Sequence, residues 1–248
     1  MKIFNMIKTR KVLWLMPAAL IALFIVDFQW IVLGTILYFP LFRWFTLTYH
    51  EYQVHKYICP KNNIVEFIGY FILAVWEWQS PIKKLVYHQI HHDFSEDPVN
   101  DPTAAKLRLT DSAVLYCFDM SPHANIPYYD ATPAAVETRM YQWFNQNWSK
   151  VLIITVLGWL IFLPFWTFLA FYIWPMFIWN IIYRTTDLTF HKWELADKPW
   201  FCLYLGTSAY HGRHHLDDSY SRETYYGKGF WRYLNIDYYI TGLLFKDY

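Results

Sequence analysis

The stretch VLIITVLGWLIFLPFWTFLAFYIWPMFIWNIIY, residues 151–183, contains no charged side chain. A bilayer crossing needs about 20 apolar residues, so this run exceeds one crossing but is short for two crossings and a loop. Pro164 interrupts the run near its middle, and proline is unfavourable inside a helix. We therefore predict a helical hairpin with membrane helices at about residues 149–164 and 166–191, whose inner ends project into water.

A second stretch, between Lys11 and Arg43, has Asp27 as its only charged residue. The step Asp27-Phe28-Gln29 breaks it and predicts another hairpin, with helices at about residues 12–27 and 29–49. The expected fold is an all-α membrane protein with four transmembrane helices arranged as two hairpins. The alternative is one long tilted helix per stretch, giving two crossings, although such lengths exceed what ordinary tilt accommodates.

Composition and charge placement agree with this fold. The chain has 248 residues, 56% hydrophobic and 17% charged, against about 25% charged in soluble proteins. Its net charge of +1 gives no reason to expect a nucleic-acid partner. Four Lys and Arg residues precede the first apolar run and none lies at either hairpin tip, which places the N-terminus in the cytoplasm.

We expect a single domain covering residues 1–248. The hairpins, at about 12–49 and 149–191, would carry a cytosolic helical cap made of residues 50–148 and 192–248, with the C-terminus also cytoplasmic. Inside the cap we predict an interfacial or re-entrant helix at 64–79, a helix that begins at Pro81, and an amphipathic helix at 133–148.

The histidines fall in this cap or at a helix end beside it. Two groups share the spacing H-x-x-H-H: His88, His91 and His92, and then His211, His214 and His215. Positions i, i+3 and i+4 lie on one face of a helix, so each group directs three imidazoles the same way. Imidazole is the commonest protein ligand for iron, zinc and copper, which predicts a polynuclear metal site.

Three further histidines and one aspartate belong to this set. His50 and His55 are five residues apart, which puts them about 140° apart on an α-helix. They could reach two metals, or one metal if the helix unwinds. Asp187 and His191 share a face where the last membrane helix leaves the bilayer. Ionisable side chains at that depth cost free energy, so they are expected to serve a function such as metal binding. His123 has no histidine nearby and is treated as an ordinary surface residue.

The loop from Asp93 to Asp101 brings four carboxylates directly after the first H-x-x-H-H group. Carboxylates often orient metal-bound imidazoles through their free N–H. A solvated acidic loop explains each carboxylate equally well when it is considered alone.

Nine imidazoles are too many for one ion, and structural zinc takes four ligands and prefers cysteine or Cys/His mixtures. They divide into two sites of four or five nitrogens each. An open, all-nitrogen pair of sites at a membrane face suits iron that binds dioxygen, with zinc as a substitute in purified protein. The expected chemistry is O2 activation followed by hydrogen abstraction from an unactivated C–H bond of a lipidic chain.

The three histidine groups resemble the histidine boxes of membrane fatty acyl desaturases. The spacing of the first two is similar to that of the stearoyl-CoA (acyl-CoA delta-9) desaturases, as is the segment Gln79-Ser80-Pro81-Ile82 before the second. His191 matches an extra ligand on the fourth membrane helix of that family. Asp187 falls where the family has an asparagine that contacts a metal through water.

The resemblance implies a four-helix bundle capped by a cytosolic domain, a non-haem centre of two iron ions, and an acyl chain in a bent apolar tunnel. It implies a cis double bond as product, with electrons from cytochrome b5 or a ferredoxin. The acyl substrate could be carried by coenzyme A, acyl carrier protein or a lipid. The implied metal ligands are His50, His55, His88, His91, His92, His191, His211, His214, His215 and Asp187.

Departures from the family pattern leave the reaction open. Asp187 replaces the asparagine, Gly212 lies within the third box where an asparagine is common, and a tryptophan usual before the second box is absent. The same centre could desaturate, hydroxylate, form an alkyne or decarboxylate. A different class is a non-catalytic membrane protein that binds zinc.

Overall fold

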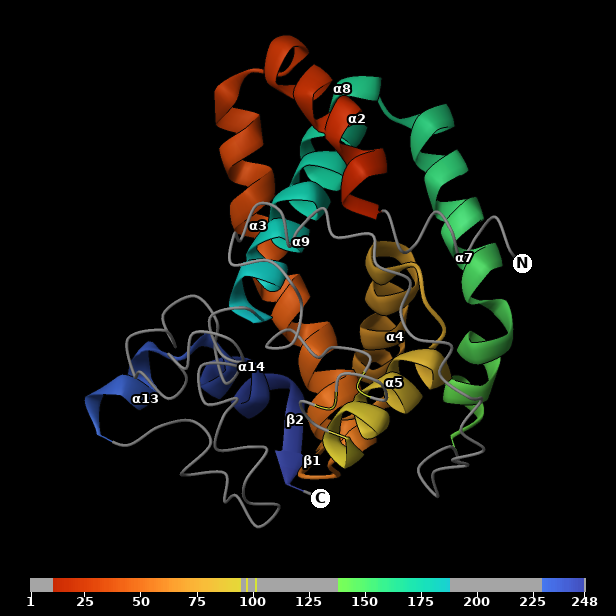
Figure 1. The fold of residues 1–248 in the computed structure, drawn as a ribbon, viewed down its shortest axis with the longest axis vertical. Coiled ribbons are helices and arrows are strands. Elements are labelled where there is room, and N and C mark those ends of the chain that lie inside the picture. Colours follow the sequence, from red (N-terminus) through yellow and green to blue (C-terminus); the bar gives the residue numbers. More distant parts are fainter. Residues whose placement is uncertain (1–10, 95–96, 98–100, 102–137, 188–228, 248) are drawn as a thin grey trace.

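In the computed structural model of the chain, residues 11–94, 97, 101, 138–187 and 229–247 are described, and they are mostly helical (Figure 1). The first half contains α2 (Lys11–Ile25), α3 (Phe28–Thr46), the π-helix η1 (Leu47–Val54), β1 (Ile58–Pro60), α4 (Asn63–Glu77) and α5 (Pro81–Asp93). The second half contains α7 (Arg139–Phe162), α8 (Phe165–Phe168), the π-helix η3 (Leu169–Ile173), α9 (Trp174–Asp187), α13 (Phe230–Leu234), α14 (Ile236–Leu244) and β2 (Phe245–Asp247).

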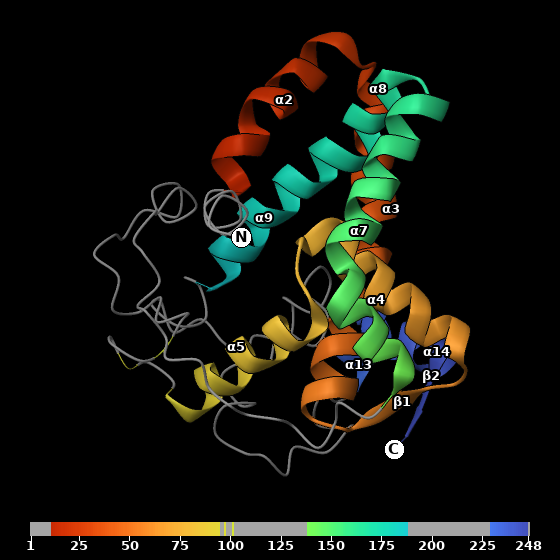
Figure 2. The ribbon, with the colours of Figure 1, turned by 90° about the vertical axis from the view of Figure 1, so that its right-hand side faces the viewer.

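Both predicted interruptions of the apolar stretches are confirmed. α2 ends at Ile25 and α3 begins after Asp27, while α7 ends at Phe162 and α8 begins after Pro164. Each stretch therefore forms two helices rather than one long helix. The two bends lie together at the top of the molecule in both views (Figures 1 and 2).

Two segments among the described residues are long and apolar enough to cross a membrane, Phe28–Val54 and Phe165–Tyr183. Leu15–Ile25 is a shorter apolar helix. Large apolar side chains around the two bends are exposed, among them Phe24 (90%), Phe28 (77%) and Phe162 (81%). Water is a poor solvent for so much apolar surface, which indicates that this end of the molecule associates with a membrane.

α7 differs from the prediction. Residues 139–162 form one continuous helix of 24 residues, although we predicted an amphipathic helix to 148 and a separate membrane helix from 149. No helix-breaking residue separates these parts, and Thr138 starts the helix by accepting a hydrogen bond from the Tyr141 amide at 3.1 Å. Residues 133–137 of the predicted helix lie outside the described residues.

The bundle is assembled from α2, α3, η3 and α9, which share one hydrophobic core. Gly34 of α3 allows α3 and η3 to pack closely, because a Cβ there would lie 2.1 Å from the backbone oxygen of Ala170 in η3. α4 lies below this bundle and packs along α7 (Figure 2). The histidine-bearing elements η1 and α5 therefore lie at the end opposite the two bends (Figure 1).

The helices predicted at 64–79 and from Pro81 are present as α4 and α5. Asn62 caps α4 by accepting hydrogen bonds from the amides of Ile64 and Val65, and Ser80 caps α5. Between them Trp78 has a left-handed backbone, with φ +54°, which is unusual for a residue other than glycine. This tight reversal turns the chain from α4 into α5 and brings α5 beside η1.

The C-terminal segment returns to η1. β2 pairs antiparallel with β1, with Cys59 opposite Lys246, and α14 packs on α3. A small second core joins Leu47 of η1, Ile58 of β1 and Phe245 of β2. The π-helix is thereby held between the bundle, α4 and the end of the chain.

Candidate metal centre

The first histidine pair lies on a π-helix rather than an α-helix. The amide of His55 donates a hydrogen bond to the carbonyl of His50 at 3.0 Å, which is the i to i+5 spacing of a π-helix. That bond places His55 nearly above His50, and their ring centroids are 4.7 Å apart. The separation of about 140° expected for an α-helix is therefore wrong, because the helix widens at this pair.

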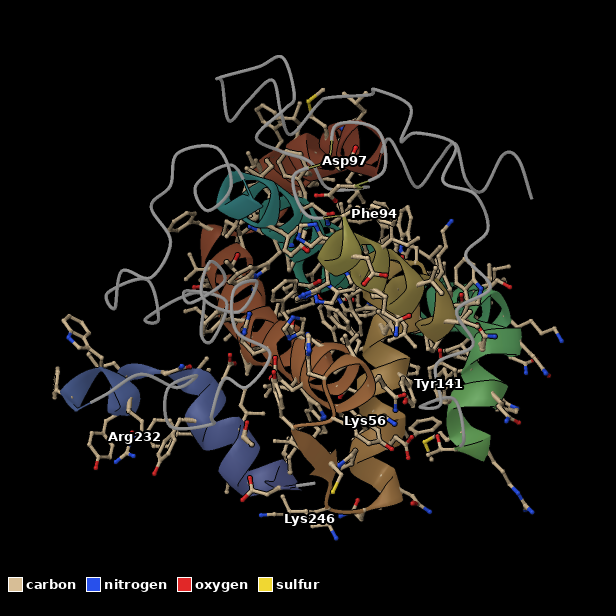
Figure 3. The ribbon with its side chains drawn as sticks, turned by 60° about the horizontal axis from the view of Figure 1, so that its bottom comes forward. Lys56, Phe94, Asp97, Tyr141, Arg232 and Lys246 are labelled. Atoms are coloured by element: carbon tan, nitrogen blue, oxygen red, sulfur yellow. The ribbon has the colours of Figure 1, made fainter. Side chains whose placement is uncertain are left out.

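α5 brings two more imidazoles to the same point. His88 and His92 are one turn apart on α5, and their ring centroids lie 4.6 Å from each other. The ring of His88 is 4.5 Å from that of His50, and the ring of His92 is 5.0 Å from that of His55. Figure 3 views this end of the molecule, with Lys56 just beyond η1 and Phe94 just beyond α5.

The four histidines match the size of one metal coordination sphere. One nitrogen from each of His50, His55, His88 and His92 lies within 4.8 Å of the others. Metal–nitrogen bonds of about 2.0–2.1 Å put adjacent ligand nitrogens about 2.9 Å apart at a right angle and about 3.4 Å apart at a tetrahedral angle. The Nε2 atoms of His88 and His92 are 3.0 Å apart. The other separations reach up to 4.8 Å, so binding one ion would draw the four imidazoles closer together.

The electrostatics favour a neutral imidazole at His88, the form that binds metals. Burial lowers the pKa of His88 well below its usual range, and the neighbouring imidazoles of His50, His92, His55 and His91 lower it further. A protonated His88 would place a positive charge among these rings. The cluster therefore keeps the lone pair of His88 available near neutral pH.

His91 is beside this group but is held differently. Its ring centroid lies 6.1 Å from that of His88 and 6.0 Å from that of His92. Its Nδ1 is 2.9 Å from Oδ1 of Asp101, and both side chains are buried. Asp101 thus makes the kind of contact predicted for a carboxylate in the loop after α5, and Nε2 of His91 is the nitrogen that this contact leaves for a metal.

Tyr49 and Lys84 form one wall beside the cluster. The Tyr49 ring is 5.9 Å from the His50 ring and 6.3 Å from the His88 ring. Lys84 lies on α5, one turn before His88, and its Nζ is 4.8 Å from the centre of the Tyr49 ring and 5.4 Å from that of Tyr183. These contacts connect η1, α5 and α9.

The described residues contain five of the ten predicted metal ligands with their side chains. Asp187 is the last residue of α9, and its side chain lies outside the described set. The remaining predicted ligands lie outside the described residues altogether: His191, His211, His214 and His215. His123 lies outside them as well. The structure therefore brings four predicted ligands together, places His91 next to them, and leaves the other assignments as predictions.

Sequence reasoning missed two residues that shape the centre. Glu51, buried to 2% exposure, pairs with Nδ1 of His50. Gly69 of α4 faces Thr48, and a Cβ at Gly69 would lie 2.1 Å from Thr48 Oγ1. The carboxylate directly after the first histidine was a usable signal for Glu51, whereas no local pattern marks Gly69.

An apolar groove lies between α7, α8 and η3, beside the turn that precedes α5. It has a volume of about 460 Å³ and is lined by Trp78, Leu152, Ile153, Val156, Leu157, Phe168, Tyr172 and Ile173. Trp78 Nε1 donates a hydrogen bond to the Tyr172 hydroxyl at 2.9 Å, and that hydroxyl donates to the carbonyl of Val75 at 2.8 Å. The polar atoms of these two rings are thus satisfied, and the groove presents carbon to its occupant.

Comparisons with protein-family models, with curated proteins and with solved structures returned no match.

Proposed function

We propose that this chain is a membrane oxidoreductase with two non-haem iron ions, which uses O2 and two external electrons to place a double bond in a fatty acyl chain. The observation that carries the proposal is the convergence of His50, His55, His88 and His92 from η1 and α5. The two apolar segments Phe28–Val54 and Phe165–Tyr183 support a membrane setting.

The first ion would be held by these four imidazoles. The second would take His91, whose Nδ1 is engaged by Asp101, together with Asp187 and the predicted ligands His191, His211, His214 and His215. Structural zinc seldom takes more than four ligands, so a set of this size suits two ions.

Iron bound here would supply O2 binding and the oxidising equivalents. The residues of the chain fix its position and its surroundings. Neutral imidazoles supply the lone pairs, and Asp101 orients His91. In the overall reaction, two hydrogen atoms of the acyl chain, two donor electrons and two protons reduce O2 to two waters. The electron donor would be an external protein such as cytochrome b5 or a ferredoxin.

The apolar groove would hold part of the acyl chain. Its volume lies in the range of ordinary ligand pockets, and its walls offer no hydrogen bond to a polar ligand. Trp78 lines the groove and lies in the turn before α5. His88 follows Pro81, the first residue of α5, by seven residues, or about 10 Å along the helix. An extended lipid chain can span such a distance, whereas a small polar substrate would not use this surface.

The test is expression in a host of known lipid composition, followed by mass spectrometry of its acyl chains. Desaturation removes two hydrogens and hydroxylation adds one oxygen, so the same experiment separates the main proposal from a hydroxylase. His92→Ala and His214→Ala should abolish the new product without preventing membrane insertion. His123→Ala is the matched control and should leave the product unchanged.

Metal analysis of the purified protein decides between an enzyme and a zinc-binding membrane protein. We expect about two iron ions per chain and O2 consumption with a suitable electron donor. Zinc alone after iron-replete expression, with no O2 consumption, would reject the enzymatic proposal.

A further inference from the structure

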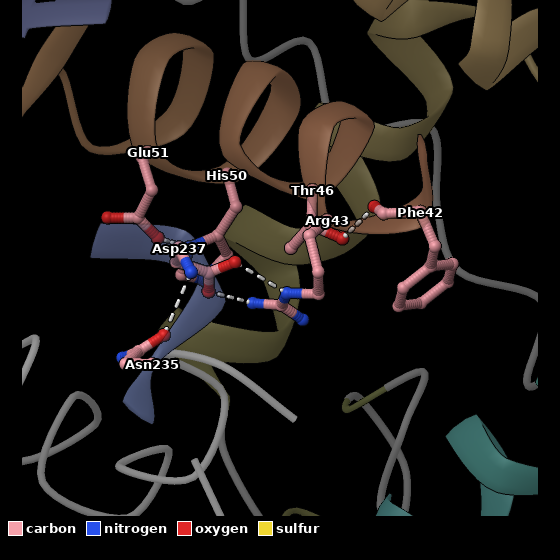
Figure 4. Close-up of polar contacts among 7 residues, drawn as sticks. All are labelled: Phe42, Arg43, Thr46, His50, Glu51, Asn235 and Asp237. Atoms are coloured by element: carbon pink, nitrogen blue, oxygen red, sulfur yellow. Dashed lines mark hydrogen bonds and ion pairs between the residues drawn. The ribbon is translucent and has the colours of Figure 1, made fainter. Parts of the chain in front are cut away.

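His50 is held by a carboxylate from its own helix. Glu51 follows it in the sequence, and a Glu51 carboxylate oxygen pairs with Nδ1 of His50 (Figure 4). The Glu51 side chain is 2% exposed and that of His50 is 10% exposed. A charged carboxylate in such a place is costly unless it is paired, and the contact with His50 provides a partner for the buried Glu51.

The neighbouring arginine has a carboxylate partner on another element. Asp237 of α14 takes the Arg43 guanidinium with both carboxylate oxygens, one of them 2.8 Å from Nε. Asn235 Oδ1 accepts a hydrogen bond from the Asp237 amide and fixes that end of α14. Figure 4 draws both contacts, Asp237 with Arg43 and Glu51 with His50.

The contact determines which nitrogen of His50 faces the cluster. When Nδ1–H donates to Glu51, the lone pair remains on Nε2, on the opposite side of the ring. The same arrangement recurs at His91, whose Nδ1 faces Asp101. Thus one histidine from η1 and one from α5 each contact a different buried carboxylate through Nδ1.

We propose that Glu51 is a positioning residue of the metal centre: it fixes the ring of His50 so that Nε2 points at the ion, and its charge strengthens that nitrogen as a ligand. The inference rests on the proposed metal site but not on the reaction that the site carries out. Carboxylates in this relation to a ligating histidine typically change metal affinity by about 10–100-fold.

The experiment measures binding of Co²⁺ alone to the purified full-length protein, by competition with a chelator and by the visible absorption of the bound ion. Glu51→Gln keeps an oxygen that can accept from Nδ1–H but removes the charge, whereas Glu51→Ala removes both. We expect Glu51→Gln to weaken binding about tenfold and Glu51→Ala up to about 100-fold. The matched control is Glu66→Gln, which alters a buried carboxylate of α4 and should leave binding unchanged.

A double-mutant cycle with His50→Ala separates positioning from direct ligation. If Glu51 acts through His50, Glu51→Ala should cost no further affinity once His50 is absent. A further loss in that background would mean that Glu51 binds the ion itself and would overturn the proposal. Wild-type affinity in both Glu51 variants would also overturn it, while leaving the metal site in place. Failure of the wild-type protein to bind Co²⁺ would instead refute the metal site and this inference together.

Discussion

Replacing Gly69 by alanine should push η1 away from α4 and weaken metal binding. The new Cβ would lie 2.1 Å from Oγ1, 2.7 Å from Cγ2 and 2.7 Å from Cβ of Thr48. Rotation of Thr48 about χ1 could move the first two atoms, but its Cβ would remain about 0.7 Å inside an ordinary contact of about 3.4 Å. The two helices must therefore separate by a large fraction of an ångström.

The cost can be estimated from two opposing effects. Alanine is favoured over glycine inside a helix by about 0.8–1.0 kcal/mol. Overpacking a tight contact typically costs about 1–3 kcal/mol and sometimes more. We expect a net destabilisation of about 1–2 kcal/mol, because the contact involves a branched side chain whose Cβ cannot move without the backbone.

The same shift should also weaken the metal centre. Thr48 is two residues before His50 on η1, so a shift of that helix moves the imidazole with it. Metal–ligand distances tolerate only about ±0.2 Å, well below the displacement required. We expect Co²⁺ affinity to fall about tenfold or more, as it does when the orientation of a ligand is disturbed.

The assay compares Gly69→Ala with Gly158→Ala in the same detergent, by thermal unfolding and by Co²⁺ competition. A Cβ at Gly158 would meet no atom within 4 Å, so that variant should be slightly stabilised and bind metal normally. Combining Gly69→Ala with Thr48→Gly removes the clash and should restore binding in part. Equal metal affinity in Gly69→Ala and Gly158→Ala would refute the reasoning.

Three further predictions concern stability and the substrate groove. Asp237→Asn should destabilise the protein by about 3–5 kcal/mol and loosen α14 from α3, because it removes the carboxylate charge that pairs with the buried Arg43; thermal unfolding and limited proteolysis measure this. Burial raises the pKa of Glu66, so stability should be full at acidic pH and fall as pH rises through that raised pKa. Glu66→Gln, which can still accept the hydrogen bond from Thr138, should remove this fall in unfolding scans at several pH values. Val156→Trp should fill the groove and shift the product toward shorter acyl chains in lipid profiles.

Matched control variants exist for Asp237→Asn and for Val156→Trp. Asp247→Asn changes an exposed carboxylate of the same C-terminal segment and should leave the unfolding midpoint almost unchanged. Ile154→Trp adds the same ring to an exposed position of α7 outside the groove and should not alter chain length. A shortened product with both tryptophan variants, or with neither, would contradict the assignment of the groove.

Much of the architecture follows from the sequence, because its causes are local. A charge or a proline inside an apolar run predicted both bends, at Asp27 and at Pro164. The proline at the first position of α5 and the spacing of its histidines predicted a helix that presents His88 and His92 on one face. The junction at residue 148 was misplaced, since nothing between the polar and apolar parts of α7 breaks a helix.

The metal centre depends on contacts that are remote in sequence. The spacing of His50 and His55 leaves their alignment undecided, and it is the π-helix between Leu47 and Val54 that stacks them. That wide turn is held by α4, which can approach because Gly69 has no side chain, and by the C-terminal strand and helix. The sequence by itself determined which residues could bind a metal and where the helices bend, since both depend on residue type and local spacing. Only the tertiary structure decided which imidazoles meet, because that depends on how closely separate helices can pack.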